Sequence, residues 1–141
     1  MQSNLLPLLR PEAENRPEVL LSEHVVFHSP VRDYHGRADV AHILTTIGNV
    51  LDELEPQREL AADRQLVTII TAAYRDHRMN GVLHETHDPA GRVEHSTLLL
   101  RPLSALLEAI TGMRAALERS PLPSTDAFSG DVGQSRSRSS S

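Results

Sequence analysis

The chain lacks cysteine, lysine and tryptophan entirely, and each absence excludes some chemistry or structure. Without cysteine there can be no disulfide, no thiolate nucleophile and no zinc–sulfur site. With no tryptophan, two phenylalanines and two tyrosines, any internal cavity should be lined mainly by aliphatic side chains. Because lysine is absent, every basic residue is an arginine. The arginines are scattered along the chain, which is typical of the coding bias of a high-GC genome.

Long apolar runs and an excess of positive charge are also missing. No stretch approaches the roughly 20 apolar residues that a membrane span requires. The N-terminal residues do not contain the basic region and apolar run of a signal peptide. The formal net charge of −5 argues against nucleic-acid binding. We therefore expect a cytoplasmic protein that contacts neither membranes nor nucleic acids.

What the sequence does contain is the pattern of one folded domain, which fits its length of 141 residues. We expect residues 1–18 to form a short N-terminal segment and residues 19–119 to form the domain. Residues 120–141 have almost no apolar content, so they are predicted to be a disordered tail.

Hydrophobic periodicity divides the domain into strands and two helices. Apolar residues spaced three and four apart predict an amphipathic helix over residues 37–54 and a second helix between Pro102 and Pro121. Pro89 and Gly91 predict a tight turn, because proline suits the second position of a type I turn and glycine the left-handed residue that closes it. Sequential strands with segregated helices indicate an α+β fold. The predicted strands cover residues 24–30, 58–63, 65–76 and both sides of the turn.

Two stretches, VVFHSPV…YHGRADVAHIL and DPAGRVEHSTLLLRPLSAL, together resemble the SnoaL-like branch of the nuclear transport factor 2-like superfamily. The shared features are a first strand ending in proline, Gly-Arg before the long helix, a Gly-Arg-Val hairpin and a strand ending in Arg-Pro. The resemblance covers residues 19–118. It implies a cone-shaped, curved mixed β-sheet packed on helices (a nuclear transport factor 2-like or cystatin-like α+β barrel), with an apolar cavity at one end. It also implies dimerisation through the sheet.

The resemblance locates two positions at which related isomerases hold acids. Members that resemble ketosteroid isomerase keep their general-base aspartate directly before the proline that ends the first strand, and that position is Ser29 here. Their second acid corresponds to Leu83. Serine is a poor proton acceptor near neutral pH and leucine cannot donate a proton, so that mechanism is not available at these positions.

Glu85 and His95 form the candidate acid–base pair. If Leu83 points into the cone, the two-residue period of a strand places Glu85 and His87 inward too. The pairing expected from the turn sets Glu85 opposite His95, within reach of a carboxylate–imidazole contact. One alternative is a hairpin tip that is polar on both faces and has no chemistry. Another is a triad of Glu85, His87 and His95 around iron, but the sequence supplies no second shell, so we expect no metal and no cofactor.

Three functions remain open from the sequence. The first is a module that binds a small apolar molecule, which the loss of both acids favours. The second is an isomerase, cyclase or hydrolase that uses Glu85–His95, and the third is a dimerisation module without a ligand. In each case a homodimer is expected. The residues expected around the cavity are Phe27, Ser29, Tyr34, Leu83, Glu85, His95, Thr97 and Leu99.

Overall fold

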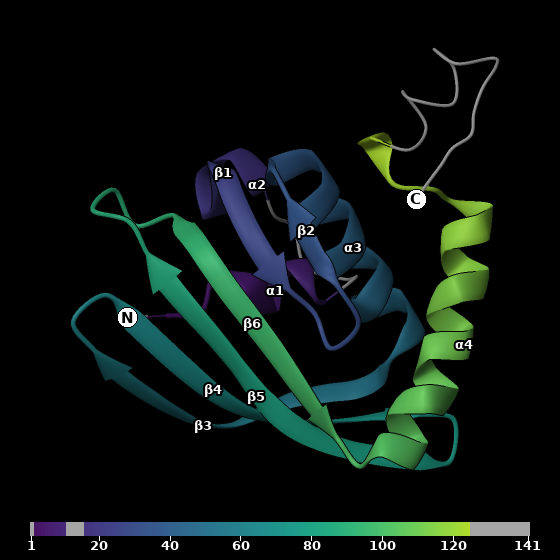
Figure 1. Ribbon diagram of the computed structural model, residues 1–141. Coiled ribbons are helices and arrows are strands. Elements are labelled where there is room, and N and C mark those ends of the chain that lie inside the picture. The colour runs from purple at the N-terminus through teal and green to yellow at the C-terminus, as the bar shows by residue number, and fades with distance from the viewer. Residues whose placement is uncertain (1, 11–15, 125–141) are drawn as a thin grey trace, which may run out of the picture.

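The computed structural model describes residues 2–10 and 16–124, which form four helices and six strands (Figure 1). No helix in this part of the chain is long and apolar enough to cross a membrane. The helices are α1 (Leu5–Leu8), α2 (Pro17–Leu20), α3 (Arg37–Val50) and α4 (Leu103–Arg119). The strands are β1 (Leu21–His28), β2 (Asp33–His35), β3 (Asp52–Ala62), β4 (Gln65–Tyr74), β5 (His77–His87) and β6 (Val93–Arg101).

The six strands form one curved sheet in the order β2-β1-β6-β5-β4-β3. β1 pairs with β6 in parallel and all other neighbours are antiparallel, so the sheet is mixed. α1 and α3 lie within the curve of the sheet, and α4 lies beside α3 (Figure 1). The predicted α+β fold with a curved mixed sheet is confirmed. The sheet remains open, because the edge strands β2 and β3 do not pair with each other.

The core lies between α3 and the inner face of the sheet. α3 buries Val40, Ile43, Leu44 and Ile47, which recur at the helical spacing that the sequence predicted. On β4 the buried residues alternate instead, as one face of a strand requires. Phe27 is fully buried on β1. The buried faces of α3, β4 and β1 therefore belong to a single core.

The predicted helix over residues 37–54 is too long, since α3 ends at Val50. Leu51 already has extended backbone angles, and Glu53 adopts a positive φ of 53°, so the chain turns sharply into β3. Leu54 is buried as a strand residue, which explains why it continued the apolar pattern of the helix. β3 also begins well before the predicted strand at residue 58, because Asp52 pairs with Ala73 of β4.

Both ends of the domain extend beyond the predicted boundaries. Leu5 and Leu9, in the segment set apart as residues 1–18, are almost fully buried in the core. Beyond α4, Leu122 is buried as well, and the backbone N–H of Ser124 donates to Asp39 Oδ1 at 3.0 Å. Residues 120–124 are therefore part of the packed domain. The remainder of the predicted tail, residues 125–141, lies outside the described residues.

Candidate functional site

The turn between β5 and β6 has the predicted form. The Asp88 N–H donates to the carbonyl of Arg92 at 2.7 Å, and the Gly91 N–H donates to the carbonyl of Asp88 at 2.9 Å. The carboxylate of Asp88 also accepts from the Arg92 N–H at 2.9 Å. Gly91 has a φ of 90°, which glycine adopts without strain. The first pair of the hairpin, His87 opposite Val93, follows directly from this turn.

Beyond this pair the register shifts by one residue, because Glu94 is left unpaired as a β-bulge in β6. His95 lies opposite Thr86, and Ser96 lies opposite Glu85. An extra residue in one strand reverses the face to which the following side chains point. The predicted Glu85–His95 pair is therefore wrong: Glu85 is fully buried on the inner face, and His95 is exposed on the outer face.

The same bulge turns Thr97 and Leu99 away from the interior. Leu99 is 59% exposed, whereas its neighbour Leu98 is buried. On the outer face the ring of His95 stacks on the ring of His28, with centroids 5.4 Å apart. The prediction that Thr97, Leu99 and His95 line an internal cavity is thus wrong for all three residues.

The inner face keeps a buried polar pair, but a different one from that predicted. Nε2 of His87 lies 3.0 Å from Oε1 of Glu85, and both side chains are buried. Because these residues are two apart on β5, they share one face of the strand. His95 does not join them, so the iron triad also fails. Among the residues that the structure describes, no group of three potential metal ligands could hold an ion.

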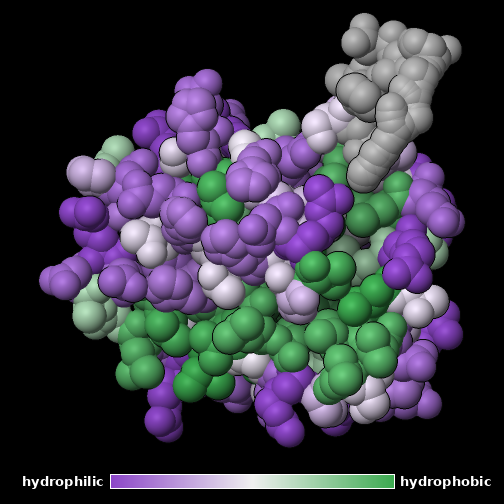
Figure 2. Space-filling view, viewed as in Figure 1, coloured by the Kyte–Doolittle hydropathy of each residue, from purple (hydrophilic) through white to green (hydrophobic). Residues whose placement is uncertain are grey.

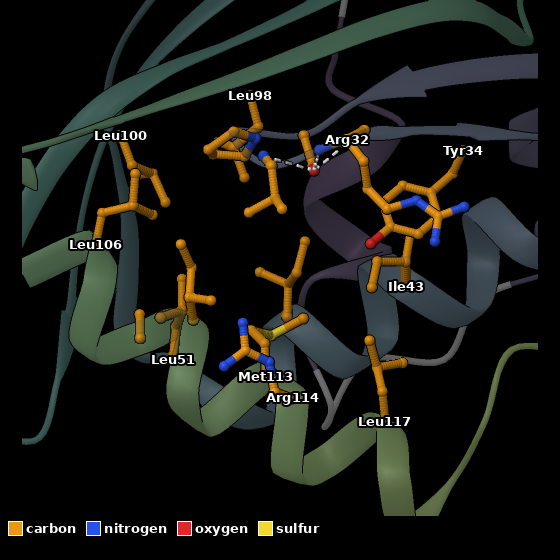
Figure 3. A pocket seen from close by; sticks show the side chains of 16 residues that line it. Arg32, Tyr34, Ile43, Leu51, Leu98, Leu100, Leu106, Met113, Arg114 and Leu117 are labelled. Atoms are coloured by element: carbon orange, nitrogen blue, oxygen red, sulfur yellow. Dashed lines mark hydrogen bonds between the residues drawn. The ribbon is translucent and has the colours of Figure 1, made fainter. Parts of the chain in front are cut away.

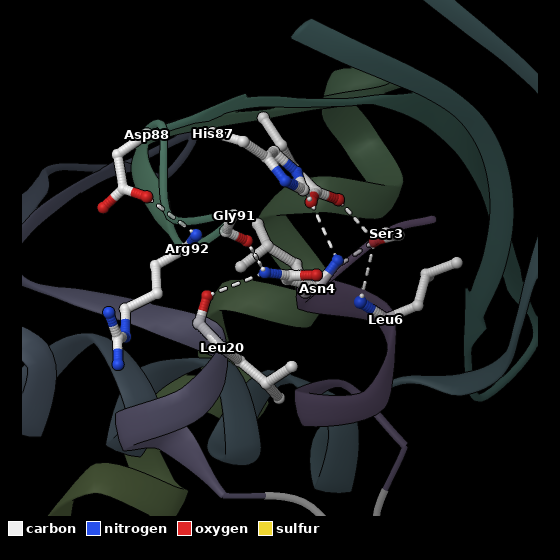
Figure 4. A network of polar contacts seen from close by, with 10 residues as sticks. Ser3, Asn4, Leu6, Leu20, His87, Asp88, Gly91 and Arg92 are labelled. Carbon is white, nitrogen blue, oxygen red and sulfur yellow. Dashed lines mark hydrogen bonds and ion pairs between the residues drawn. The ribbon is translucent and has the colours of Figure 1, made fainter. Parts of the chain in front are cut away.

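The N-terminal segment closes this polar end of the interior (Figure 4). The Ser3 hydroxyl donates to Oε2 of Glu85, and the Asn4 backbone N–H donates to Oε1 at 2.9 Å. The Asn4 side-chain amide donates in turn to the carbonyls of Leu20, at 3.0 Å, and Gly91, at 2.8 Å. The chain itself thus occupies both oxygens of Glu85. In this arrangement the carboxylate acts as an internal anchor for the N-terminal segment.

An open pocket of about 220 Å³ lies toward the other end of β6 (Figure 3). It is enclosed by α3, α4, β6 and the loop between β1 and β2. α4 buries Ala105 and Ala109, and its larger apolar residues that face the pocket, such as Leu106, Ile110 and Met113, are half-buried. The lining residues from α3 and the residue after it, β6 and α4 are Ile43, Ile47, Leu51, Leu98, Leu100, Leu106, Ala109, Ile110, Met113, Arg114 and Leu117; Ser29, Pro30, Val31, Arg32 and Tyr34 complete the wall.

The polar groups of this pocket are Ser29, Arg32, Tyr34 and Arg114; no carboxylate or imidazole lines it. The Ser29 hydroxyl donates to the carbonyl of Arg32 at 2.8 Å and accepts from the N–H of Val31 at 3.1 Å. This hydroxyl therefore stabilises the turn after β1. The arrangement can hold an apolar molecule and donate hydrogen bonds to it, but it has no group suited to accept a proton near neutral pH.

Tyr34 is the buried polar residue of the pocket, with 7% of its surface exposed. Burial raises the pKa of its phenol; the nearby Arg32 guanidinium opposes that shift and the Asp39 carboxylate adds to it. The guanidinium of Arg32 lies over the ring, 4.7 Å from its centroid, in cation–π contact. The phenol consequently remains a hydrogen-bond donor throughout the neutral pH range.

Only part of the predicted cavity wall is found at the pocket. Ser29 and Tyr34 line it, whereas Phe27 and Leu83 are fully buried in the core away from it. Sequence reasoning missed the contribution of α4, although the helical spacing after Pro102 already placed several apolar residues on one face. The residues missed on β6 and α4 are Leu98, Leu100, Leu106, Ala109, Ile110, Met113, Arg114 and Leu117.

Comparison with known proteins gives matches in structure. No protein-family model matches the chain, and no curated protein matches it in sequence. A steroid delta-isomerase from Pseudomonas aeruginosa is 25% identical, with a TM-score of 0.74 over 84% of this chain and 95% of that one. An uncharacterised bacterial protein with a cystatin-like fold from Silicibacter pomeroyi DSS-3 is 20% identical, with a TM-score of 0.76 over 93% of this chain and 92% of its own.

A third similar structure names the fold family. It is a protein of unknown function from Burkholderia xenovorans LB400, described as NTF-2 like, which is 12% identical with a TM-score of 0.58 over 70% of this chain and 77% of that one. At such identities the likeness concerns the fold. As the resemblance of residues 19–118 predicted, the chain has the fold of the nuclear transport factor 2-like superfamily.

Proposed function

We propose that the protein binds a small apolar molecule in the pocket between α3 and α4. The observation that supports this most directly is the lining, which is mainly aliphatic and open to solvent. Apolar surface removed from water contributes roughly 25 cal/mol per Å² to binding. Pockets for drug-sized ligands have volumes of roughly 300–1,000 Å³. A pocket of about 220 Å³ therefore favours a smaller ligand.

Binding without acid–base chemistry agrees better with this site than isomerisation does. Ser29 stands where related isomerases hold their base, and its hydroxyl is engaged in the turn after β1. Arginine stays protonated and tyrosine stays neutral at physiological pH, so neither is a ready proton acceptor. Glu85, the buried carboxylate of the inner face, lies under the N-terminal segment and does not line the pocket.

The proposal is tested by filling the pocket from α4. Ile110→Trp adds bulk at a lining position, and Leu107→Trp adds the same bulk to the same helix at a position that is 54% exposed and does not line the pocket. Calorimetric titration with 1-octanol should show binding to the wild type and to Leu107→Trp, and at least tenfold weaker binding to Ile110→Trp. Equal binding to all three proteins, or no binding to the wild type, would contradict the proposed site.

A specific observation also supports a homodimer formed through the sheet. Ile69, Val82 and Leu99 lie opposite one another on three adjacent strands, so they form an apolar row on the outer face. Leu99 is the most exposed of the three. Figure 2 shows apolar side chains gathered in a band across one face of the molecule. The buried centre of a homodimer interface is more apolar than the rest of a protein surface. We propose that a second copy of the chain covers this row.

Native mass spectrometry tests the dimer directly. Leu99→Arg places a charge in the centre of the row and should convert the dimer to a monomer without changing 1-octanol binding. Leu60→Arg is a matched control, since Leu60 is similarly exposed but lies on the edge strand β3. A wild-type protein that is monomeric at all concentrations would refute the dimer and leave the ligand pocket untouched.

A further inference from the structure

The charge at the pocket is opposite in sign to the net charge of the whole chain. The sequence has 19 acidic and 14 basic residues, so an average patch of surface should carry more carboxylates than guanidinium groups. Among the 16 residues that line the pocket there are two arginines and no acid. The pocket is therefore a locally cationic site on an anionic protein.

The two arginines line the pocket from different parts of the chain. Arg32 lies in the loop between β1 and β2, and Arg114 lies on α4 (Figure 3). Stacking on Tyr34 holds the Arg32 guanidinium over an aromatic face. Within residues 2–10 and 16–124, neither arginine forms an ion pair. Both are thus available to a negatively charged group from outside the chain.

The acids nearest to Arg32 in sequence already have partners. The carboxylate of Asp33 contacts the His28 ring at 2.7 Å on the outer side of the sheet. The carboxylate of Asp39 accepts from the backbone N–H of Ser124 at 3.0 Å and from its hydroxyl at 2.6 Å. Neither residue lines the pocket. The pocket wall therefore presents Arg32 and Arg114 without a carboxylate, and among the described residues Glu108 and Glu118, the acids nearest to Arg114 in sequence, form no ion pair with it.

We propose that the ligand is an aliphatic monocarboxylate whose chain lies among the leucines of β6 and α4 and whose carboxylate faces Arg32 and Arg114. This inference rests on the proposed function and specifies its ligand class. A guanidinium group suits a carboxylate because its planar N–H donors match the two oxygens. The Tyr34 phenol, which stays protonated, is a further donor on the same wall of the pocket.

The pocket is smaller than the roughly 300–1,000 Å³ of pockets for drug-sized ligands, so a ligand of modest length suits it. Octanoate, an aliphatic monocarboxylate of modest length, is therefore the probe. 1-Octanol and octylammonium have the same chain with a neutral and a cationic head group, respectively.

Titration of the three probes separates the head group from the chain. Contacts with exposed arginines are modest, so each is expected to change affinity by up to about fivefold. Octanoate should therefore bind about tenfold more tightly than 1-octanol at low ionic strength, and octylammonium should bind most weakly. The advantage of octanoate should shrink as salt is added, because salt screens exposed charges.

Arg114→Gln provides the second test, with Arg119→Gln as a control of equal charge on the same helix but outside the pocket. Arg114→Gln should weaken octanoate binding by about fivefold and leave 1-octanol binding unchanged. Arg119→Gln should change neither. Equal affinities for octanoate and 1-octanol in the wild type would overturn the carboxylate but keep the apolar pocket. Failure of all three probes to bind would overturn the proposed function itself.

Discussion

The two ends of the protein's interior differ in what fills them. At the hairpin end, the Glu85 carboxylate and the His87 ring are buried, and Ser3 and Asn4 of the N-terminal segment occupy the remaining hydrogen-bonding positions of the carboxylate. At the α4 end, an open aliphatic pocket contains no acid and no histidine. The groups capable of acid–base chemistry are thus in the closed region, and the space for a ligand is in the other.

We propose ligand binding in place of isomerase chemistry because of this difference. Proton transfer requires the acid or base to be within hydrogen-bonding reach of the ligand. Here the buried carboxylate anchors the chain, and the open pocket has only donors and apolar walls. Leu83 and the other core residues are buried from solvent. If the closed end is structural and the open end is not, substitutions at the two ends should differ in their effects on stability and on ligand binding.

The largest effect is expected at the anchor. Glu85→Ala removes the acceptor used by Ser3, Asn4 and His87, and breaking such a buried charged network costs about 3–5 kcal/mol of unfolding free energy. Urea denaturation measures the loss. Glu94→Ala, at the half-exposed bulge on the neighbouring strand, is the control and should cost less than about 0.5 kcal/mol. Similar losses in the two variants would mean that Glu85 is not an anchor.

The next largest contrast is between leucines of the two regions. Leu83→Ala removes a fully buried side chain and should cost about 3 kcal/mol. Leu106→Ala removes a half-buried side chain from the wall of an open pocket, so it should cost about 1 kcal/mol. Leu106→Ala should also weaken 1-octanol binding. Leu83→Ala should leave 1-octanol binding unchanged, provided that the variant is folded. Equal destabilisation by both changes would show that the pocket is closed in solution.

Two helical glycines provide a third comparison. Alanine normally stabilises a helix by roughly 1 kcal/mol relative to glycine. At Gly48 the new Cβ would lie 2.2 Å from the backbone oxygen of Leu9, so Gly48→Ala should instead destabilise the protein by about 2 kcal/mol. At Gly112 the nearest atoms belong to the end of the Tyr74 side chain, which can move. Gly112→Ala should therefore be close to neutral, and thermal unfolding of the two variants distinguishes these outcomes.

The sequence predicted the architecture well because its signals are local and strong. The periodicity of α3, the turn at Gly91 and the alternation of β4 each follow from the residues concerned and agree with the structure. The family resemblance supplied the curved sheet, which periodicity alone does not determine. Boundaries shifted at places such as Leu54, where a strand residue continued a helical pattern by coincidence, and the short elements α1, α2 and β2 were not predicted.

The site was predicted less well, for two physical reasons. The unpaired Glu94 shifts the register by one residue, and a single bulge moves every later side chain of β6 to the opposite face. No local sequence pattern around Glu94 indicates this bulge. The second reason is the N-terminal segment: its role depends on long-range hydrogen bonds from Ser3 and Asn4 to Glu85, which sequence spacing does not reveal. Ser29 and Tyr34 do line the pocket, and both lie at or just after the proline-ended strand that the sequence indicated.

The smallest effect concerns the open region and appears only at alkaline pH. Burial raises the pKa of Tyr34 above its ordinary value of 10.0. Above about pH 10 the unfolded chain therefore loses this proton more readily than the folded one, and stability falls as the pH rises. The chain has no lysine or cysteine, so tyrosines are the main side chains that titrate in this range.

Melting temperatures between pH 8 and pH 11 should fall less for Tyr34→Phe than for the wild type. Tyr74→Phe is the control, because Tyr74 lies outside the pocket. If the melting temperatures of Tyr34→Phe and the wild type fall equally with pH, the Tyr34 phenol is exposed to solvent in the folded protein, and the pocket is open at Tyr34.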